Sequence, residues 1–210
     1  MSATANSQLT RSAVTLKGSA QLVTQFFNYG INSILYQRGI YPPESFTRKQ
    51  EYGLTLLVST DDKVNEFLKE LLTKIEGWLE ERKILKLVLV LGSVETKEIL
   101  ERWEFKIEYE TEDGGKENQF VETSNKDEKK IKAEIRDVIR QITASVTFLP
   151  LLDCLCSFDV LIYTKKDVDV PTAWSESDAC LISNCEVVKL RSFSTGIHKL
   201  EAAVSYKADL

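Results

Sequence analysis

The chain has 210 residues, of which 43% are hydrophobic and 28% are charged, and its formal net charge is −5. This length and composition favour one full-sized domain with its own core, and the acidic balance argues against a basic nucleic-acid clamp. The single histidine, His198, excludes a multi-histidine metal site and leaves one imidazole as a candidate base.

The N-terminal residues and the cysteines indicate the cellular compartment. Four cysteines occur, at Cys154, Cys156, Cys180 and Cys185, and their spacings match no zinc pattern. We expect them to be reduced thiols in a cytosolic or nuclear protein. The first ten residues lack the apolar core of a targeting peptide. No apolar run approaches the roughly 18 residues that a membrane span needs.

The first long helix is predicted to be central. Residues 1–13 form a polar arm, and Ser19 is a candidate N-cap for a helix that runs to Gln37. The apolar residues of this helix form two adjacent stripes, which is too wide for a surface helix and predicts burial. The helix stops near Gly39, and Pro42-Pro43 bars its continuation.

Residues 52–110 predict strands around a second helix. One or two short strands are expected within residues 52–59. An amphipathic helix then begins near Ser59 or Thr60, with Asp61 and Asp62 in its first turn, and reaches Leu79. The continuous apolar run 86–92 predicts a central strand buried on both faces. Residues 102–110 alternate strictly, which predicts a strand with one solvent-facing side.

A third helix carries a basic stripe. Residues 111–127 hold few apolar side chains and predict a mobile loop. The helix follows from about residue 128 to 148 and ends before Pro150. Lys129, Lys132, Arg136 and Arg140 lie opposite its apolar face, either as solvated surface or as a protein-docking face. The residues alone leave both interpretations open.

The C-terminal third has an uncertain register. Residues 155–163 predict a strand, residues 165–185 are irregular, and residues 186–194 predict another strand. Trp174 is either anchored to the body of the protein or a recognition group. Residues 195–206 fit a strand and a helical turn equally well, and such a segment is prone to alternate pairings.

No catalytic motif is present. The sequence has no GxGxxG, GxxxxGK[ST] or GxSxG pattern. No local signature joins His198 to a cysteine, so we expect a surface or half-buried strand histidine. The residues therefore predict an α+β domain with three long helices on an antiparallel sheet, and they favour a binding protein over an enzyme.

Several stretches resemble one known family. They are residues 26–42, 100–105, 139–150 and 190–195, together with His198-Lys199. In this order they resemble the HORMA domain, and within it the mitotic-arrest-deficient branch of the spindle assembly checkpoint, from about Val14 to Lys207.

The resemblance implies one domain with two parts. The core spans about residues 14–163, and a mobile C-terminal safety belt, here called the belt, spans about residues 164–210. In the open form of the family, the last segment of the belt pairs with the edge strand, here residues 155–163. In the closed form, that segment moves to the opposite edge, and the freed strand takes up an extended partner peptide under the belt.

Site residues follow from the resemblance. The peptide-binding edge strand is expected to use Leu155, Ser157, Phe158, Asp159, Leu161 and Tyr163. The belt residues are expected to be Trp174, Arg191, Phe193, His198, Leu200, Val204 and Tyr206. Open and closed copies are expected to dimerise through Arg136, Arg140, Gln141 and Phe148.

The resemblance also implies partners and location. The expected partners are the activator of the anaphase-promoting complex, a kinetochore coiled-coil receptor, other mitotic checkpoint complex subunits, a silencing HORMA adaptor, a remodelling ATPase and a second copy of the chain. Nucleus, kinetochore and cytoplasm are the expected locations. No cofactor, metal, nucleic acid or membrane is expected. A HORMA adaptor for DNA repair or meiotic chromosome axes is the alternative, and an enzyme ranks third. Ala202 excludes a phosphorylation switch at its position, whereas Ser177 is a candidate modification site.

Overall fold

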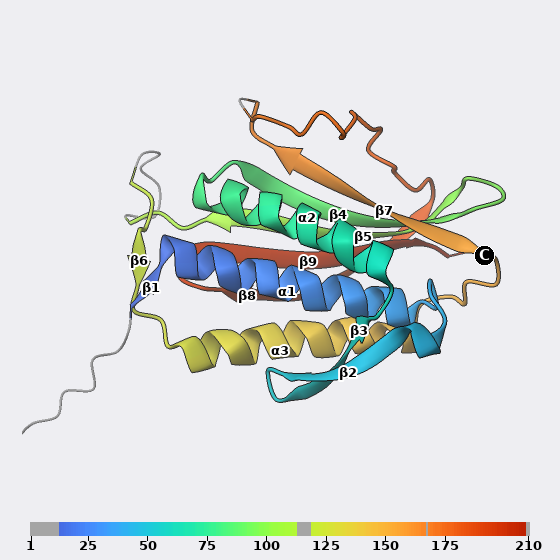
Figure 1. Ribbon diagram of the computed structural model, residues 1–210, viewed down its shortest axis with the longest axis horizontal. Helices are drawn as coiled ribbons and strands as arrows, with labels where there is room; N and C mark the ends of the chain where they lie inside the picture. The colour runs from blue at the N-terminus through green and yellow to red at the C-terminus, as the bar shows by residue number, and fades with distance from the viewer. Residues whose placement is uncertain (1–12, 113–118, 167, 209–210) are drawn as a thin grey trace, which may run out of the picture.

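The computed structural model describes residues 13–112, 119–166 and 168–208 of the chain (Figure 1). A five-stranded antiparallel sheet has the strand order β7-β4-β5-β9-β8. The main-sheet strands are β4 (Ile84–Ser93), β5 (Ile99–Tyr109), β7 (Cys156–Thr164), β8 (Cys185–Ser194) and β9 (His198–Lys207). Three helices pack against it: α1 (Leu16–Gln37), α2 (Asp62–Glu80) and α3 (Glu128–Ala144). The α+β prediction is confirmed.

Helix α1 lies at the centre of the core. It contacts α2, α3 and β9, and Phe26, Phe27, Ile31 and Ile34 are fully buried. The predicted start is wrong, because the N-cap is Thr15, whose Oγ1 accepts from the Gly18 N–H over 3.1 Å. Ser19 lies inside the helix instead and is buried.

Helices α2 and α3 begin at aspartate caps. Asp61 caps α2 by accepting from the Val64 N–H, and Asp127 caps α3 by accepting from the Lys129 N–H. Helix α3 is shorter than predicted. Its end tightens into the 3₁₀ turn η2 (Ser145–Thr147), where the Ser145 and Thr147 hydroxyls bond backbone carbonyls of the last helical turns.

Sequence reasoning missed one strand and misjudged one loop. β2 (Phe46–Glu51) pairs with β3 (Leu54–Ser59), after the short turn η1 (Pro43–Ser45), and β2 was missed because only Phe46 in it is apolar. β1 (Val14–Thr15) pairs with β6 (Thr123–Ser124), and Thr111 bridges Phe120. The expected loop therefore contains a short strand and a bridge, while residues 113–118 lie outside the described residues, as does the arm up to residue 12.

The sheet has two different edges. β4 lies between β7 and β5, as its apolar run predicts, and the β8–β9 hairpin pairs with β5. The ambiguous residues 195–206 form a turn followed by β9. No helix in the described residues is long and apolar enough to cross a membrane.

Candidate functional site

Strand β7 offers an open edge. One side of it pairs with β4 from Thr164 to Cys156, and within the described residues no strand pairs with the other side. An edge strand carries a row of unpaired backbone N–H and C=O groups, so an extended chain can add to it through main-chain hydrogen bonds.

Five of the six predicted edge-strand residues lie in β7 and divide between its two faces. Phe158 points to the helix side, where its ring lies 6.2 Å from the Tyr41 ring and 5.8 Å from the Phe67 ring of α2. Ser157, Asp159, Leu161 and Tyr163 alternate with it and face the opposite side. Leu155 precedes the strand and is 75% exposed.

The belt passes around this open edge. Trp174 packs edge-to-face on Trp78 of α2, with the ring centroids 5.6 Å apart, so Trp174 is anchored to the body. Five residues later, the Ala179 carbonyl accepts a hydrogen bond from Arg102 Nε over 3.2 Å. Phe105 on the same strand packs against α1, and the strand's alternation therefore turns Arg102 to the opposite face of the sheet. Figure 1 shows the irregular segment that follows β7 running alongside this strand, and the two contacts lie on opposite faces of the sheet.

A charged cluster holds Arg102 in place. Arg102 Nη1 lies 2.5 Å from Glu104 Oε2, Lys86 Nζ lies 3.1 Å from the same oxygen, and Arg102 Nη2 donates to the Tyr163 hydroxyl over 3.4 Å. Burial alone raises the pKa of Glu104, but the hydrogen bonds from Arg102 and Lys86 outweigh it and lower that pKa. The cluster thus joins β4, β5 and β7 to the belt.

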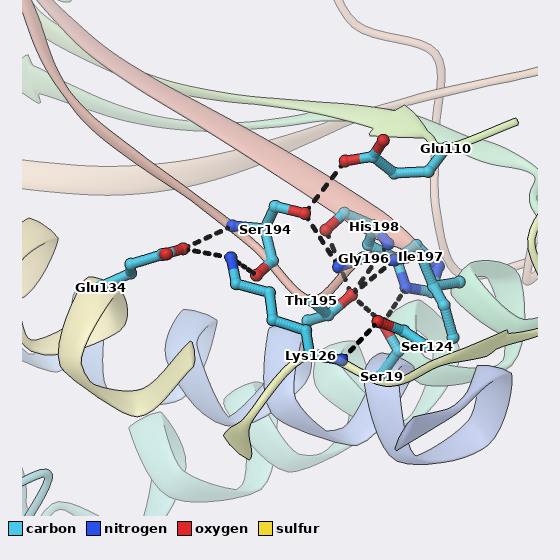
Figure 2. Close-up of polar contacts among 10 residues, drawn as sticks. All are labelled: Ser19, Glu110, Ser124, Lys126, Glu134, Ser194, Thr195, Gly196, Ile197 and His198. Atoms are coloured by element: carbon cyan, nitrogen blue, oxygen red, sulfur yellow. Dashed lines mark hydrogen bonds and ion pairs between the residues drawn. The ribbon is translucent and has the colours of Figure 1, made fainter. Parts of the chain in front are cut away.

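His198 is the centre of a buried polar network (Figure 2). Its Nδ1 lies 2.5 Å from Ser19 Oγ of α1, and its Nε2 lies 3.3 Å from the Leu79 carbonyl of α2. Thr195 Oγ1 lies 2.6 Å from Ser19 Oγ and accepts from the His198 N–H. The predicted surface or half-buried histidine is wrong, because these partners enclose the ring completely. Burial lowers its pKa to about 4, so the ring is neutral at physiological pH.

The same turn is fastened to α3. Lys126 Nζ bonds both Glu134 Oε2 and the Ser194 carbonyl over 2.7 Å, and Ser194 Oγ donates to Glu110 over 3.0 Å (Figure 2). Gly196 has φ +83°, and a Cβ there would lie 2.0 Å from Ser124 Oγ. The β8–β9 hairpin is therefore held at the β5 edge by α1, α2 and α3 together.

The remaining belt residues divide between core and surface. Phe193, Leu200 and Val204 are buried, and the Phe193 ring lies 5.0 Å from the Phe26 ring. Tyr206 is half-buried, and Arg191 is exposed.

The expected dimerisation residues gather near β8. Arg140 is exposed, and Phe148 is 44% exposed. Gln141 accepts from the Arg191 backbone N–H, and Arg191 Nη1 lies 3.1 Å from Asp137 Oδ2. Arg136 is half-buried and lies 3.8 Å from Asp137. α3 and β8 thus form one continuous surface. The basic stripe is not uniform, since Lys132 pairs with Glu128 over 2.7 Å.

A buried ion pair was missed by sequence reasoning. Arg38 Nε donates to Glu101 Oε1 over 2.8 Å, Trp103 Nε1 donates to Glu101 Oε2 over 3.0 Å, and Arg38 also bonds the Pro150 carbonyl. Burial raises the pKa of Glu101, against the opposing effect of Arg38. The signal was visible in the alternation, which puts Glu101 on the same face as Trp103. No group of potential metal ligands occurs among the described residues.

Comparisons with known proteins identify the family. The HORMA domain model matches residues 19–198. The mitotic spindle assembly checkpoint protein MAD2A of Mus musculus is 53% identical over 194 residues, covering 92% of this chain and 93% of that protein. The crystal structure of the mitotic checkpoint complex contains a chain with a TM-score of 0.82 and 43% identity, covering 91% of this chain and 99% of that chain.

A more distant structure shares the fold alone. HTP-2 of C. elegans, solved bound to the HIM-3 closure motif, has a TM-score of 0.75 at 14% identity, covering 93% of this chain and 92% of that chain. The chain described here belongs to the HORMA domain family. Its close relatives within that family are the MAD2 proteins of the mitotic spindle assembly checkpoint, as in Homo sapiens at 52% identity. These comparisons indicate no enzyme family.

Proposed function

We propose that the chain is a spindle checkpoint protein that captures an extended peptide on the open edge of β7, under the belt. The peptide belongs to the activator of the anaphase-promoting complex or to the kinetochore receptor, and its capture delays anaphase until kinetochores attach. The observation that carries the proposal is the course of the belt around the open edge, from the Trp78–Trp174 contact to the Arg102–Ala179 hydrogen bond.

Backbone hydrogen bonds to β7 provide the affinity for the peptide, and the belt makes its release slow. An added strand pairs with the unpaired groups of β7, and alternate side chains meet Phe158 on one face and Tyr163 on the other. A peptide threaded under the belt is released only after the belt opens, so the off-rate follows belt opening.

The chain switches between two pairings. The described arrangement, with β9 on the β5 edge, has the strand order expected of the closed form. In the open form, the last segment of the belt leaves β5 and pairs with β7, which blocks the peptide. Such a switch needs two packings within a few kcal/mol of each other.

The other partners use other surfaces. Open and closed copies dimerise through Arg140, Gln141 and Phe148, with Arg136 and Arg191 beside them, and the silencing adaptor uses the same face. The remodelling ATPase engages the N-terminal arm. The chain is expected to assemble with other subunits of the mitotic checkpoint complex. Nucleus, kinetochore and cytoplasm are the expected locations.

Backbone-modified peptides test strand addition directly. We compare a labelled peptide of the anaphase activator with two versions that are N-methylated at adjacent residues. Adjacent N–H groups of a strand point to opposite sides, so only one version loses a hydrogen bond to β7. The proposal expects that version alone to lose affinity, and equal losses would contradict it. Peptides of DNA-repair and meiotic-axis proteins run in parallel, and their preferred binding would favour the alternative adaptor role.

A further inference from the structure

Two thiols lie against each other at the start of β7. Cys154 Sγ and Cys156 Sγ are 3.7 Å apart, and both residues are half-buried. The Cys156 thiol also donates to the Cys154 carbonyl over 3.4 Å. Between them, Leu155 is exposed. Its carbonyl accepts a hydrogen bond from the Val94 N–H over 2.8 Å, and this bond joins the start of β7 to the end of β4.

We propose that Cys154 and Cys156 form a reversible dithiol–disulfide site that is oxidised by small disulfides of the glutathione class. The chemical part of this inference stands on the geometry of the two sulfurs. Its consequence for peptide capture rests on the proposed function.

The exchange proceeds in two steps that balance. The Cys154 thiolate attacks one sulfur of the small disulfide, forms a mixed disulfide and releases the first small thiolate, which gains a proton. Cys156 then loses its proton, attacks the Cys154 sulfur and releases the second small thiol. Two electrons pass from the two protein thiols to the small disulfide. Burial raises the pKa of Cys156 to about 12, which suits the resolving position better than the attacking one.

The new bond must distort the start of β7. A disulfide bond is about 2 Å long, so the two sulfurs must approach from 3.7 Å. Cys154 lies in a bend just before β7, and only Leu155 separates it from Cys156, the first residue of the strand, so the approach of the sulfurs shifts the backbone at Leu155. This shift moves the Leu155 carbonyl away from the Val94 N–H and disturbs the pairing of Cys156 with Ser93. A strained disulfide of this kind is easily reduced, as a reversible site requires.

The first test is chemical. The full chain is equilibrated in glutathione redox buffers, quenched and analysed by intact mass and peptide mapping. We expect an internal disulfide joining Cys154 and Cys156, with loss of two hydrogens. The link should be absent in Cys154→Ser and present in the control Cys180→Ser/Cys185→Ser. Persistent glutathionylation without an internal link, or links to Cys180 or Cys185, would overturn the proposal.

The second test measures the backbone hydrogen bonding at the start of β7 and the affinity for the peptide. On oxidation, hydrogen exchange at the Val94 amide should accelerate in the wild type and stay unchanged in Cys154→Ser; unchanged exchange in oxidised wild type would refute the distortion. Peptide affinity should fall about fivefold to tenfold, because a distorted start of β7 would offer the peptide roughly one hydrogen bond fewer. If the reduced protein binds no peptide, the proposed function fails, while mass analysis still decides the dithiol site.

Discussion

Arg102 Nε donates a hydrogen bond to the Ala179 carbonyl over 3.2 Å, and this contact fastens the belt to the face of the sheet opposite the helices. The same guanidinium is held by Glu104 and reaches Tyr163 on β7. The strand that would receive a peptide and the belt that would cover it therefore share one arginine.

Loss of this arginine should speed peptide release. Arg102→Met removes a hydrogen bond from a charged donor to the belt, worth about 1.5–3 kcal/mol, so the off-rate should rise by about tenfold or more if belt opening limits release. Stopped-flow displacement of a labelled peptide measures it. Lys106→Met is the control, because Lys106 lies on the same face but is exposed and bonds only Glu108 among the described residues. An unchanged off-rate in Arg102→Met would show that the Arg102–Ala179 hydrogen bond does not hold the belt closed over the peptide.

His198 should make stability fall in mild acid. Its folded pKa is about 4 and its ordinary value is 6.5, so between these values the unfolded chain binds a proton that the folded chain excludes. Stability is lost as pH falls from about 6.5 towards 4, by up to roughly 3 kcal/mol. Urea unfolding at several pH values, compared with His198→Gln, isolates this contribution. If the unfolding free energies of the two proteins changed with pH in the same way, the buried neutral state of His198 would be contradicted.

The buried Arg38–Glu101 pair should be intolerant of single changes. Glu101→Gln leaves the Arg38 charge buried without a counter-ion, which should cost about 3–5 kcal/mol of unfolding free energy. The matched control is Glu108→Gln, at an exposed ion pair of the same strand, with a cost below about 1 kcal/mol. Equal effects in urea unfolding would mean that burial does not set the cost. Arg38→Met with Glu101→Leu should recover much of the loss.

The α3–β8 surface should govern self-association. Arg140→Glu with Gln141→Ala should abolish open–closed dimers in sedimentation velocity while peptide binding persists, because neither residue touches β7. Lys132→Glu is a control on the same helix, outside the proposed contact. Wild-type dimerisation of the double variant would show that the docking face lies elsewhere.

Truncation of the C-terminus should show that peptide binding at the β7 edge depends on β9 at the β5 edge. Removal of about ten C-terminal residues deletes most of β9 and leaves the β5 edge without its partner. The closed arrangement cannot form, so peptide binding should be lost while the helices persist by circular dichroism. Retained peptide affinity after truncation would contradict the role of the belt.

Much of the fold was predictable because the apolar spacing is strong. The continuous run of β4 and the wide stripe of α1 each allow one structural interpretation. β2 was missed because only Phe46 in it is apolar, and Ser19 was misassigned because cap and core roles of serine look alike in sequence. His198 could not be placed, since its partners Ser19 and Leu79 are distant in the chain and meet only in the folded protein. Arg102 begins the stretch that was predicted to have one solvent-facing side, and its burial could not be predicted because its partners Tyr163 and Ala179 are distant in the chain.

Hydrogen exchange of the β7 amides tests the central claim most directly. The protein is exchanged with and without the anaphase-activator peptide, and amides from residues 155 to 164 are followed individually. The account predicts strong new protection at alternate β7 amides, those not bonded to β4, together with slower exchange around Ala179. Peptide binding that leaves the β7 amides unprotected would contradict strand addition under the belt.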